Sequence, residues 1–337
     1  MWIRLSGALR VIACGLGLLL SAAACGRSQA QPTTPAKSTV ATHHGRLTDY
    51  VTAAGLRWML VGRPRVFADS PDFLAAFEHL VPKDRLDAFA KGSGVNLRTL
   101  PEGCIAGFDY GTIYLARVGK ETSHVRERFE ARLVSEAVTK SAAPGVWRVT
   151  GLVANTPESL LTVDDDFAAI SVGDPLLVRV AEGFALGKFK KTSPALTGAS
   201  LSTLPKDFER APLRFYAPGP FAESWAKGVD GLLARAYAVG ATVSPGTDTT
   251  LKLHLVITGA FGPDLEQSRI RVLKTWDALL NSPVGHVLEL ERAVDANSFE
   301  LAVDEGQAIL DVSLNANLLI KGFSAAVQAD TRALFDW

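Results

Sequence analysis

The sequence contains little cysteine and no excess of either charge. Only 3 of its 337 residues are cysteine, which excludes a scaffold held together by disulfides. Its 35 basic side chains balance 35 acidic ones, so the broad electrostatic argument for a nucleic-acid partner is missing. Charged residues make up 21% of the chain and hydrophobic residues 47%, which excludes a disordered chain and is typical of a folded protein.

Common catalytic and metal-binding motifs are absent as well. The patterns G-x-S-x-G, H-E-x-x-H and C-x-x-C do not occur. Ser224 and Lys227 match S-x-x-K, the nucleophile motif of penicillin-binding proteins, but about one such match is expected by chance and the companion S-D-N is missing. Asp164, Asp165 and Asp166 lack the spacing of an EF-hand calcium loop. We therefore predict no catalytic, cofactor-binding or metal-binding residues, and we favour a binding role over an enzyme.

Residues 1–24 have the pattern of a signal peptide, and Cys25 follows them directly. The segment begins with Arg4 and Arg10, continues with an apolar run and ends in small residues. Its apolar run is shorter than the roughly 20 residues that a membrane-spanning helix needs. The placement of Cys25 resembles the lipobox of bacterial lipoproteins, although Ala22 stands where leucine is commonest. This resemblance implies that Cys25 becomes the acylated first residue of the mature chain; an ordinary cleaved signal and an uncleaved anchor are the alternatives.

The same resemblance implies a location. Several acyl chains on Cys25 would anchor the protein durably in a membrane of the cell envelope, whereas a single chain binds only marginally. Gly26 follows the cysteine in place of aspartate, which by the sorting rule of many such lipoproteins implies the outer rather than the inner membrane. Residues 25–46, rich in Pro, Ser, Thr and Gln, form the predicted lipidated N-terminus and flexible tether.

The strongest signal in the rest of the chain is an internal similarity. Residues 161–172, LTVDDDFAAISV, align with residues 301–312, LAVDEGQAILDV, at an offset of 140. The same offset aligns two further pairs, residues 112–116 with 252–256 and Gly145 with Gly285. Because these pairs occur in the same order along the chain, we predict a tandem duplication.

Each copy is predicted to be an α+β module, an antiparallel sheet with helices packed on one face. Leu251, Leu253 and Leu255 alternate with polar residues, which is typical of a strand with one buried face. Adjacent strands joined by hairpins favour an antiparallel sheet. The predicted modules span residues 47–187 and 213–337, joined by a Ser-, Thr- and Pro-rich linker at 188–212. A single continuous core is the alternative to two separate sheets.

The signal, the cysteine, the tether and the two copies occur together with the strings GVNLRTL, LRFYAPGP and LTVDDDFAAISVGD. In this combination the chain resembles a family of uncharacterised bacterial lipoproteins with duplicated α+β modules, whose domain has no assigned function. The resemblance implies no catalytic residues.

We therefore expect a membrane-anchored envelope lipoprotein with a binding or structural role. Its partner would be an envelope protein, a lipid or a glycan at the seam between the modules, because clefts at domain interfaces are favoured ligand sites. The alternative is a periplasmic hydrolase whose active site is assembled from scattered residues in that cleft. Converging Ser, His, Asp or Glu side chains would favour the hydrolase, and a deep apolar cavity would favour a lipid ligand.

Overall fold

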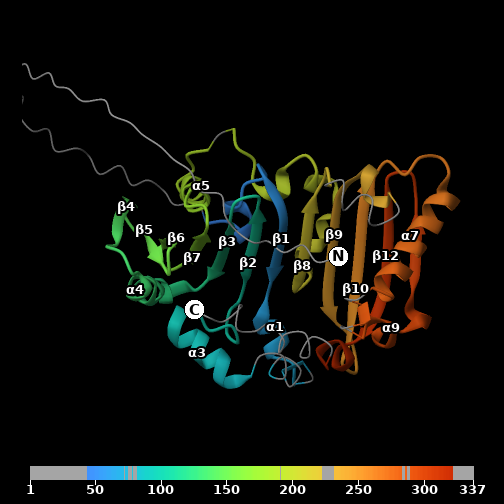
Figure 1. The fold of residues 1–337 in the computed structure, drawn as a ribbon, viewed down its shortest axis with the longest axis horizontal. Helices are drawn as coiled ribbons and strands as arrows, with labels where there is room; N and C mark the ends of the chain where they lie inside the picture. The colour runs from blue at the N-terminus through green and yellow to red at the C-terminus, as the bar shows by residue number, and fades with distance from the viewer. Residues whose placement is uncertain are drawn as a thin grey trace, which may run out of the picture. The chain divides into compact units, whose positions relative to one another are not determined.

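Figure 1 shows the computed structural model, which describes residues 44–71, 73–74, 78, 82–189, 191–221, 231–282, 285–286 and 289–321. All of them belong to one compact unit, residues 39–337. Cys25, Ser224 and Lys227 lie outside the described residues. No helix in these described ranges is both long and apolar enough to cross a membrane.

The framework of the described chain is one sheet of 12 strands in which every neighbouring pair is antiparallel (Figure 1). The first half of the chain supplies β1 (Leu56–Gly62), β2 (Gly103–Phe108), β3 (Thr112–Arg117), β4 (Val138–Ala143), β5 (Val146–Val153), β6 (Thr156–Val163) and β7 (Phe167–Val172). The second half supplies β8 (Leu213–Pro218), β9 (Ala236–Pro245), β10 (Thr250–Gly259), β11 (Glu300–Val303) and β12 (Gln307–Asn315). Their spatial order is β11-β12-β10-β9-β8-β1-β2-β3-β7-β6-β5-β4.

The two predicted modules share this sheet through the pairing of β1 with β8. The paired residues run from Met59 opposite Tyr216 to Gly62 opposite Leu213. The core is therefore continuous, which is the alternative that the sequence leaves open. Outward from this seam the order is β1-β2-β3-β7-β6 on one side and β8-β9-β10-β12-β11 on the other, with the hairpin β4–β5 added only to the first half.

The offset of 140 holds for some of the aligned pairs and not for others. Residues 112–116 and 252–256 lie in β3 and β10, which occupy the same place in the two halves. Gly145 lies in the turn between β4 and β5, whereas Gly285 lies in a helical turn. The common strand order is compatible with a duplication, and the duplication itself stays a prediction.

The described helical segments are mostly short. In the first half they are η1 (Leu47–Tyr50), α1 (Pro64–Ala68), α3 (Lys83–Ser93), η2 (Gly119–Glu121), α4 (Thr122–Arg132) and α5 (Leu176–Ala185). In the second half they are η6 (Leu232–Arg235), α7 (Leu265–Leu280), α9 (Leu290–Ala293) and η7 (Ala296–Ser298). Between the halves lie η3 (Ala195–Thr197), η4 (Leu201–Thr203) and η5 (Lys206–Arg210).

Helices cover both faces of the sheet in the first half, so the predicted α+β class is confirmed but the single covered face is wrong. Leu160 of β6 packs with Phe129 of α4, whereas its neighbour Leu161 belongs to the core that includes Phe184 of α5. Successive residues of a strand point to opposite faces, so α4 and α5 must lie on opposite sides. Amphipathic periodicity identifies a helix but does not say which face of a sheet it will cover.

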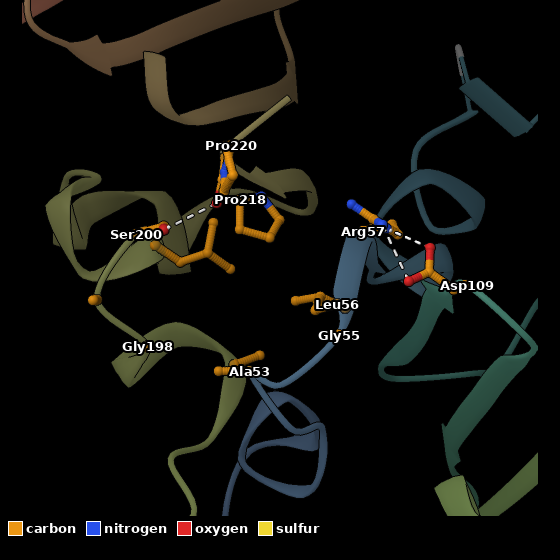
Figure 2. Close-up of a pocket in the computed structure, with 13 residues that line it drawn as sticks. Ala53, Gly55, Leu56, Arg57, Asp109, Gly198, Ser200, Pro218 and Pro220 are labelled. Carbon is orange, nitrogen blue, oxygen red and sulfur yellow. Dashed lines mark hydrogen bonds and ion pairs between the residues drawn. The ribbon is translucent and has the colours of Figure 1, made fainter. Parts of the chain in front are cut away.

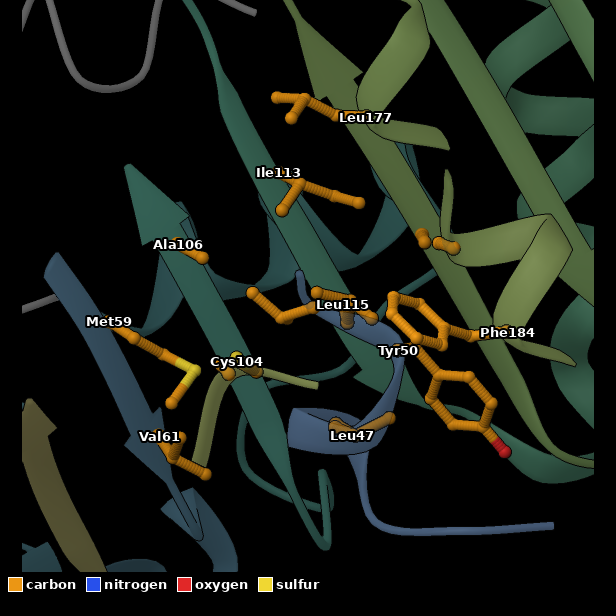
Figure 3. Close-up of a cluster of buried hydrophobic side chains, with 14 of the residues drawn as sticks. Leu47, Tyr50, Met59, Val61, Cys104, Ala106, Ile113, Leu115, Leu177 and Phe184 are labelled. Atoms are coloured by element: carbon orange, nitrogen blue, oxygen red, sulfur yellow. The ribbon is translucent and has the colours of Figure 1, made fainter. Parts of the chain in front are cut away.

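The main core lies on the α5 side of the sheet (Figure 3). Six side chains of β1, β2 and β3 form its floor with at most 2% of their surface exposed: Met59, Val61, Cys104, Ala106, Ile113 and Leu115. Above them the rings of Tyr50 and Phe167 stack with 4.2 Å between centroids. Burial raises the pKa of the Cys104 thiol, as expected for a small apolar side chain with no reactive role.

The segment predicted as a linker, residues 188–212, packs closely on this core. Leu201, Leu204 and Phe208 are at most 7% exposed and belong to the same apolar cluster as Met59. The hydroxyl groups of Thr203 and of Thr258 in β10 are 2.7 Å apart. The segment is therefore part of the main core and is not a solvent-exposed linker, because its own apolar side chains are buried there.

Candidate functional site

A cavity of about 310 Å³ lies at the seam, beside the start of β1 and the end of β8 (Figure 2). Much of its wall is glycine, alanine and proline, because the backbones approach closely here. A Cβ atom on Gly198 would lie 2.7 Å from the Cβ of Ala53, and one on Gly219 would lie 2.6 Å from the carbonyl oxygen of Ala236. The sequence predicts a ligand site in this region, at the seam between the two modules.

The polar side chains of the seam cavity are engaged with one another or with the backbone. Arg57 donates two hydrogen bonds to Asp109, with Nε–Oδ1 at 2.6 Å and Nη2–Oδ2 at 3.1 Å (Figure 2). Ser200 Oγ donates to the backbone oxygen of Gly219 at 3.3 Å. Among the described lining residues there is no histidine, and Ser200 has no carboxylate partner. These residues do not place a nucleophile beside a base, the arrangement that covalent hydrolysis needs.

The aspartates at 164–166 form a turn whose last carboxylate is used inside the protein. Asp166 is only 5% exposed, and it is bonded to the guanidinium of Arg117. His44 Nδ1 lies 2.9 Å from Asp166 Oδ2. In the part of the chain that the structure describes, no three His, Cys, Asp or Glu side chains are grouped as a metal site would require.

A larger cavity of about 450 Å³, the apolar cavity, lies on the opposite face from the main core. The sheet forms its floor, and α3 and α4 with the segment between α3 and β2 form its wall. The side chains of the floor are Leu60, Ile105, Tyr114, Ala116, Ala168 and Ile170. Those of the wall include Phe89, Val95, Leu97, Leu100, Val125 and Phe129.

The floor of the apolar cavity is incompletely covered even though it lies in the middle of the sheet. Leu60 and Ile105 are half-buried, whereas their neighbours Val61 and Cys104 on the other face are at most 1% exposed. Protein interiors are normally packed as densely as organic crystals. The helices α3 and α4 therefore stand over the floor without filling the space between.

Polar chemistry is confined to a few groups in the wall. Among the described lining residues only Ser93, Tyr114 and Arg132 carry a polar group that can reach the apolar cavity, since Cys104 belongs to the opposite core. Arg132 is the last residue of α4, and its guanidinium carbon lies 5.6 Å from the centre of the Phe129 ring. Its side chain is 17% exposed.

Arg132 forms an ion pair with Glu158 of β6. The distance from Arg132 Nη2 to Glu158 Oε2 is 3.1 Å, and the glutamate side chain is 9% exposed. Burial raises the pKa of Glu158, and the neighbouring guanidinium opposes that shift. Burial and the charge of Glu158 both raise the pKa of Tyr114. Arg132 is in the described lining of the apolar cavity and Glu158 is not.

No motif points to the apolar cavity, but one weaker signal was available in the sequence. The strand segments WMLV, CIAGF and TIYLA are apolar at both odd and even positions. Strands of that kind are buried on both faces of a sheet. This pattern indicates a second apolar layer beneath the first half, on the face that the predicted one-sided module leaves open.

No protein-family model matches the chain, and no curated protein matches it. Among solved structures, two crystal forms of TP0453 are similar to it, each with a TM-score of 0.48. Form III is 8% identical in sequence and aligns with 84% of this chain and 99% of that one. Form IV is 10% identical and aligns with 82% of this chain and 96% of that one.

Proposed function

We propose that the protein is held at a membrane of the cell envelope by a lipid on Cys25 and binds a long acyl chain in the apolar cavity. The observation that supports binding is the cavity itself, about 450 Å³ of space with aliphatic and aromatic side chains on floor and wall. Small-molecule pockets of roughly 300–1,000 Å³ with mainly apolar walls and a few polar groups are the usual form of a ligand site. The signal sequence and Cys25 support the location.

The energy available from the apolar cavity is sufficient for binding. Each methylene group that leaves water gains about 0.8 kcal/mol, so a chain of about ten methylenes gains roughly 8 kcal/mol. Part of that gain is offset by the lost freedom of the ligand. Micromolar affinity needs about 8 kcal/mol net, so a chain of ten methylenes binds more weakly than that, and each further methylene in the cavity tightens the binding.

The hydrolase alternative gains no comparable support. In the described lining of the seam cavity, Ser200 has neither a histidine nor a carboxylate as a partner. In the described lining of the apolar cavity, Ser93 Oγ donates to the backbone oxygen of Phe89 at 2.7 Å. A serine hydroxyl bonded to the backbone carbonyl four residues earlier is a structural element of a helix end. We therefore favour binding.

Titration with cis-parinaric acid, a fluorescent long-chain fatty acid, tests the proposal. The full chain carrying Cys25→Ser is used, because it cannot be acylated and needs no detergent that would compete for the apolar cavity. We expect saturable binding of one molecule per chain. A linear, unsaturable signal would contradict the proposal.

A cavity-filling variant shows where the probe binds. Ala116→Phe places a ring over the floor and should weaken binding by about tenfold or more, since the ring occupies the ligand's space. Ala302→Phe is the matched control, because Ala302 is exposed on the edge strand β11 and lies far from the lining residues in the strand order. Both variants are checked by thermal unfolding. Equal affinity of two folded variants would place the probe elsewhere and refute the proposal.

A further inference from the structure

We infer that the free edge of the sheet at β4 is an interaction surface whose partner is a second copy of this chain. In this pairing the two β4 strands run antiparallel about a two-fold axis at Val138, so that the two sheets join into one. The inference rests on the exposed edge, on the apolar residues beside it and on the order of charges along it. It does not depend on a ligand in the apolar cavity.

β4 is an open edge of the described sheet. It lies at one end of the strand order, and β5 is its one partner among the described strands (Figure 1). Its first four residues, Val138 to Ser141, are all exposed. An edge strand carries a row of backbone N–H and C=O groups on its outer side, so it can pair with a strand of another chain. The other end of the order, β11, is only four residues long and offers a shorter edge.

Exposed apolar side chains gather at this corner of the sheet. The exposed fractions are 71% for Val134, 55% for Val138 and 40% for Leu152 of β5. The backbone N–H of Val134 donates to the oxygen of Leu152 at 2.9 Å. Val138 opposes Thr150, which precedes Leu152 by two residues on the same face of β5. Single exposed apolar residues are common, whereas a group of them marks a contact surface.

The charges along this edge are unpaired within the described part of one chain. Glu136 and Lys140 are both exposed, and they lie two residues before and two residues after Val138. An extended chain rises about 3.3 Å per residue, so the two lie roughly 13 Å apart, too far for an ion pair with each other. Among the residues that the structure describes, neither forms an ion pair with another side chain. Lys140 instead opposes Arg148 of β5, which has the same charge.

A second copy supplies both missing partners at once. With Val138 of one copy opposite Val138 of the other, Lys140 of each copy lies opposite Glu136 of the other, because a two-fold contact is reciprocal. Alternate residues of a strand share a face, so all three pairs lie on one face of the joined sheet. A centre at Thr139 would place Lys140 opposite Val138, and a centre at Lys140 would oppose like charges. A lone lysine on an edge normally prevents pairing, but here the sequence provides a glutamate that matches it.

Cysteine crosslinking tests the register of the pairing. Opposite residues of antiparallel strands have Cα atoms roughly 4.5–5.5 Å apart, which is within the range of a disulfide. Val138→Cys in the Cys25→Ser chain should oxidise to a covalent dimer at least about tenfold faster than Ala302→Cys, the matched change at an exposed position of the other edge strand. The Cys25→Ser chain without a new cysteine gives the background from Cys14 and Cys104. Equal rates at positions 138 and 302 would overturn the inference.

Charge reversal separates this pairing from random collision. Lys140→Glu places two like-charged pairs in the interface, so it should slow crosslinking through Val138→Cys by about fivefold or more. Adding Glu136→Lys restores opposite charges in the same register and should return the rate to within about twofold of the original. Both positions are exposed, so the fold should be unaffected, which thermal unfolding checks. A rate that Lys140→Glu leaves unchanged, or that the double variant fails to restore, is incompatible with this pairing.

Sedimentation equilibrium measures the association without a cysteine at the interface. The Cys25→Ser chain should form a reversible dimer as its concentration is raised to about 1 mM, since a contact between two edge strands is small and weak. Lys140→Glu should lower the dimer fraction, and the double variant should restore it. A chain that stays monomeric over this range would refute the inference, while saturable binding of cis-parinaric acid would still support the proposed function.

Discussion

Tyr216 and Tyr50 are two buried tyrosines whose hydroxyl groups differ in their surroundings. Both side chains belong to the main core and are at most 2% exposed. The Tyr216 hydroxyl has no hydrogen-bond partner among the residues that the structure describes, whereas the Tyr50 hydroxyl accepts from the backbone N–H of Gly45 at 2.9 Å. The same substitution, tyrosine to phenylalanine, should therefore have opposite effects at the two positions.

The expected sizes follow from the cost of burying polar groups. An unsatisfied buried hydroxyl costs about 1–3 kcal/mol, and phenylalanine has the same shape without it. We expect Tyr216→Phe to raise the free energy of unfolding by about 1 kcal/mol. Tyr50→Phe takes the acceptor from Gly45 and should lower it by about 0.5–1 kcal/mol.

The effect at Tyr216 should also depend on pH. Burial raises the pKa of its phenol to about 12 in the folded state, and the unfolded value is about 10. The folded state therefore holds the proton more tightly, so this contribution to stability is complete below about pH 10 and is lost as pH rises toward 12. Phenylalanine has no proton to lose. The advantage of Tyr216→Phe over the parent chain should consequently grow between pH 9 and pH 11.

Urea unfolding followed by tryptophan fluorescence measures both effects in the Cys25→Ser chain. Curves at pH 8 and at pH 10.5 give the free energies and show whether the slope with urea is unchanged. A Tyr216→Phe variant that is less stable than its parent by 1 kcal/mol would refute the reasoning, because it would mean that the hydroxyl has a stabilising partner.

Two further predictions concern the anchor and the ion pairs near the seam. Radiolabelled palmitate should mark the parent chain in bacterial cells and leave Cys25→Ser unlabelled; equal labelling of both would reject the lipid anchor. Arg214, 4% exposed on β8, bonds to Glu102 at 2.8 Å, so Arg214→Met should cost about 3–5 kcal/mol in urea unfolding. Asp109→Asn breaks an exposed pair and should cost less than about 1 kcal/mol. A similar loss of unfolding free energy in the two variants would contradict the conclusion that the Arg214 pair is buried and the Asp109 pair exposed.

Strand positions could be predicted from the sequence because alternation is a local property. The segment 112–116 lies within β3, and the segment 252–256, aligned with it in the sequence, lies within β10. Leu253 and Leu255 face the cluster that contains Trp276 of α7, while His254 between them faces Phe208 of the joining segment. Here the apolar side chains face the apolar cluster and the polar one faces the other way. The alternation therefore identifies the strand even when its partner strand is unknown.

The pairing of β1 with β8 could not be predicted in the same way. Strands pair through backbone groups that every residue carries, so a sequence does not show which edges will meet. The sequence therefore predicts two separate sheets, one in each predicted module, and a linker between them. Leu201, Leu204 and Phe208 are buried only because the merged sheet offers them a surface.

The apolar cavity is harder still to read from a sequence, because it consists of space that side chains leave empty. Arg132 ends an amphipathic helix, where a basic residue is ordinarily interpreted as solvated. Its burial depends on β6 bringing Glu158 to it from another part of the chain. Neither residue belongs to a motif, and 26 positions separate them.

The merged sheet also gives a physical reason why this cavity can stay open. An empty space costs stability, because the atoms that line it lose contacts on one side. The strands of the floor are closed on their other face by the main core, and β1 is hydrogen-bonded on both edges, to β2 and to β8. These strands keep their geometry without tight packing of α3 and α4 on the floor. A site that its framework holds open is preorganised, and preorganisation lowers the free energy that a ligand must supply. In the proposed function, the seam between the halves would contribute to binding by supporting the floor of the apolar cavity, away from the seam cavity where the sequence predicts a ligand.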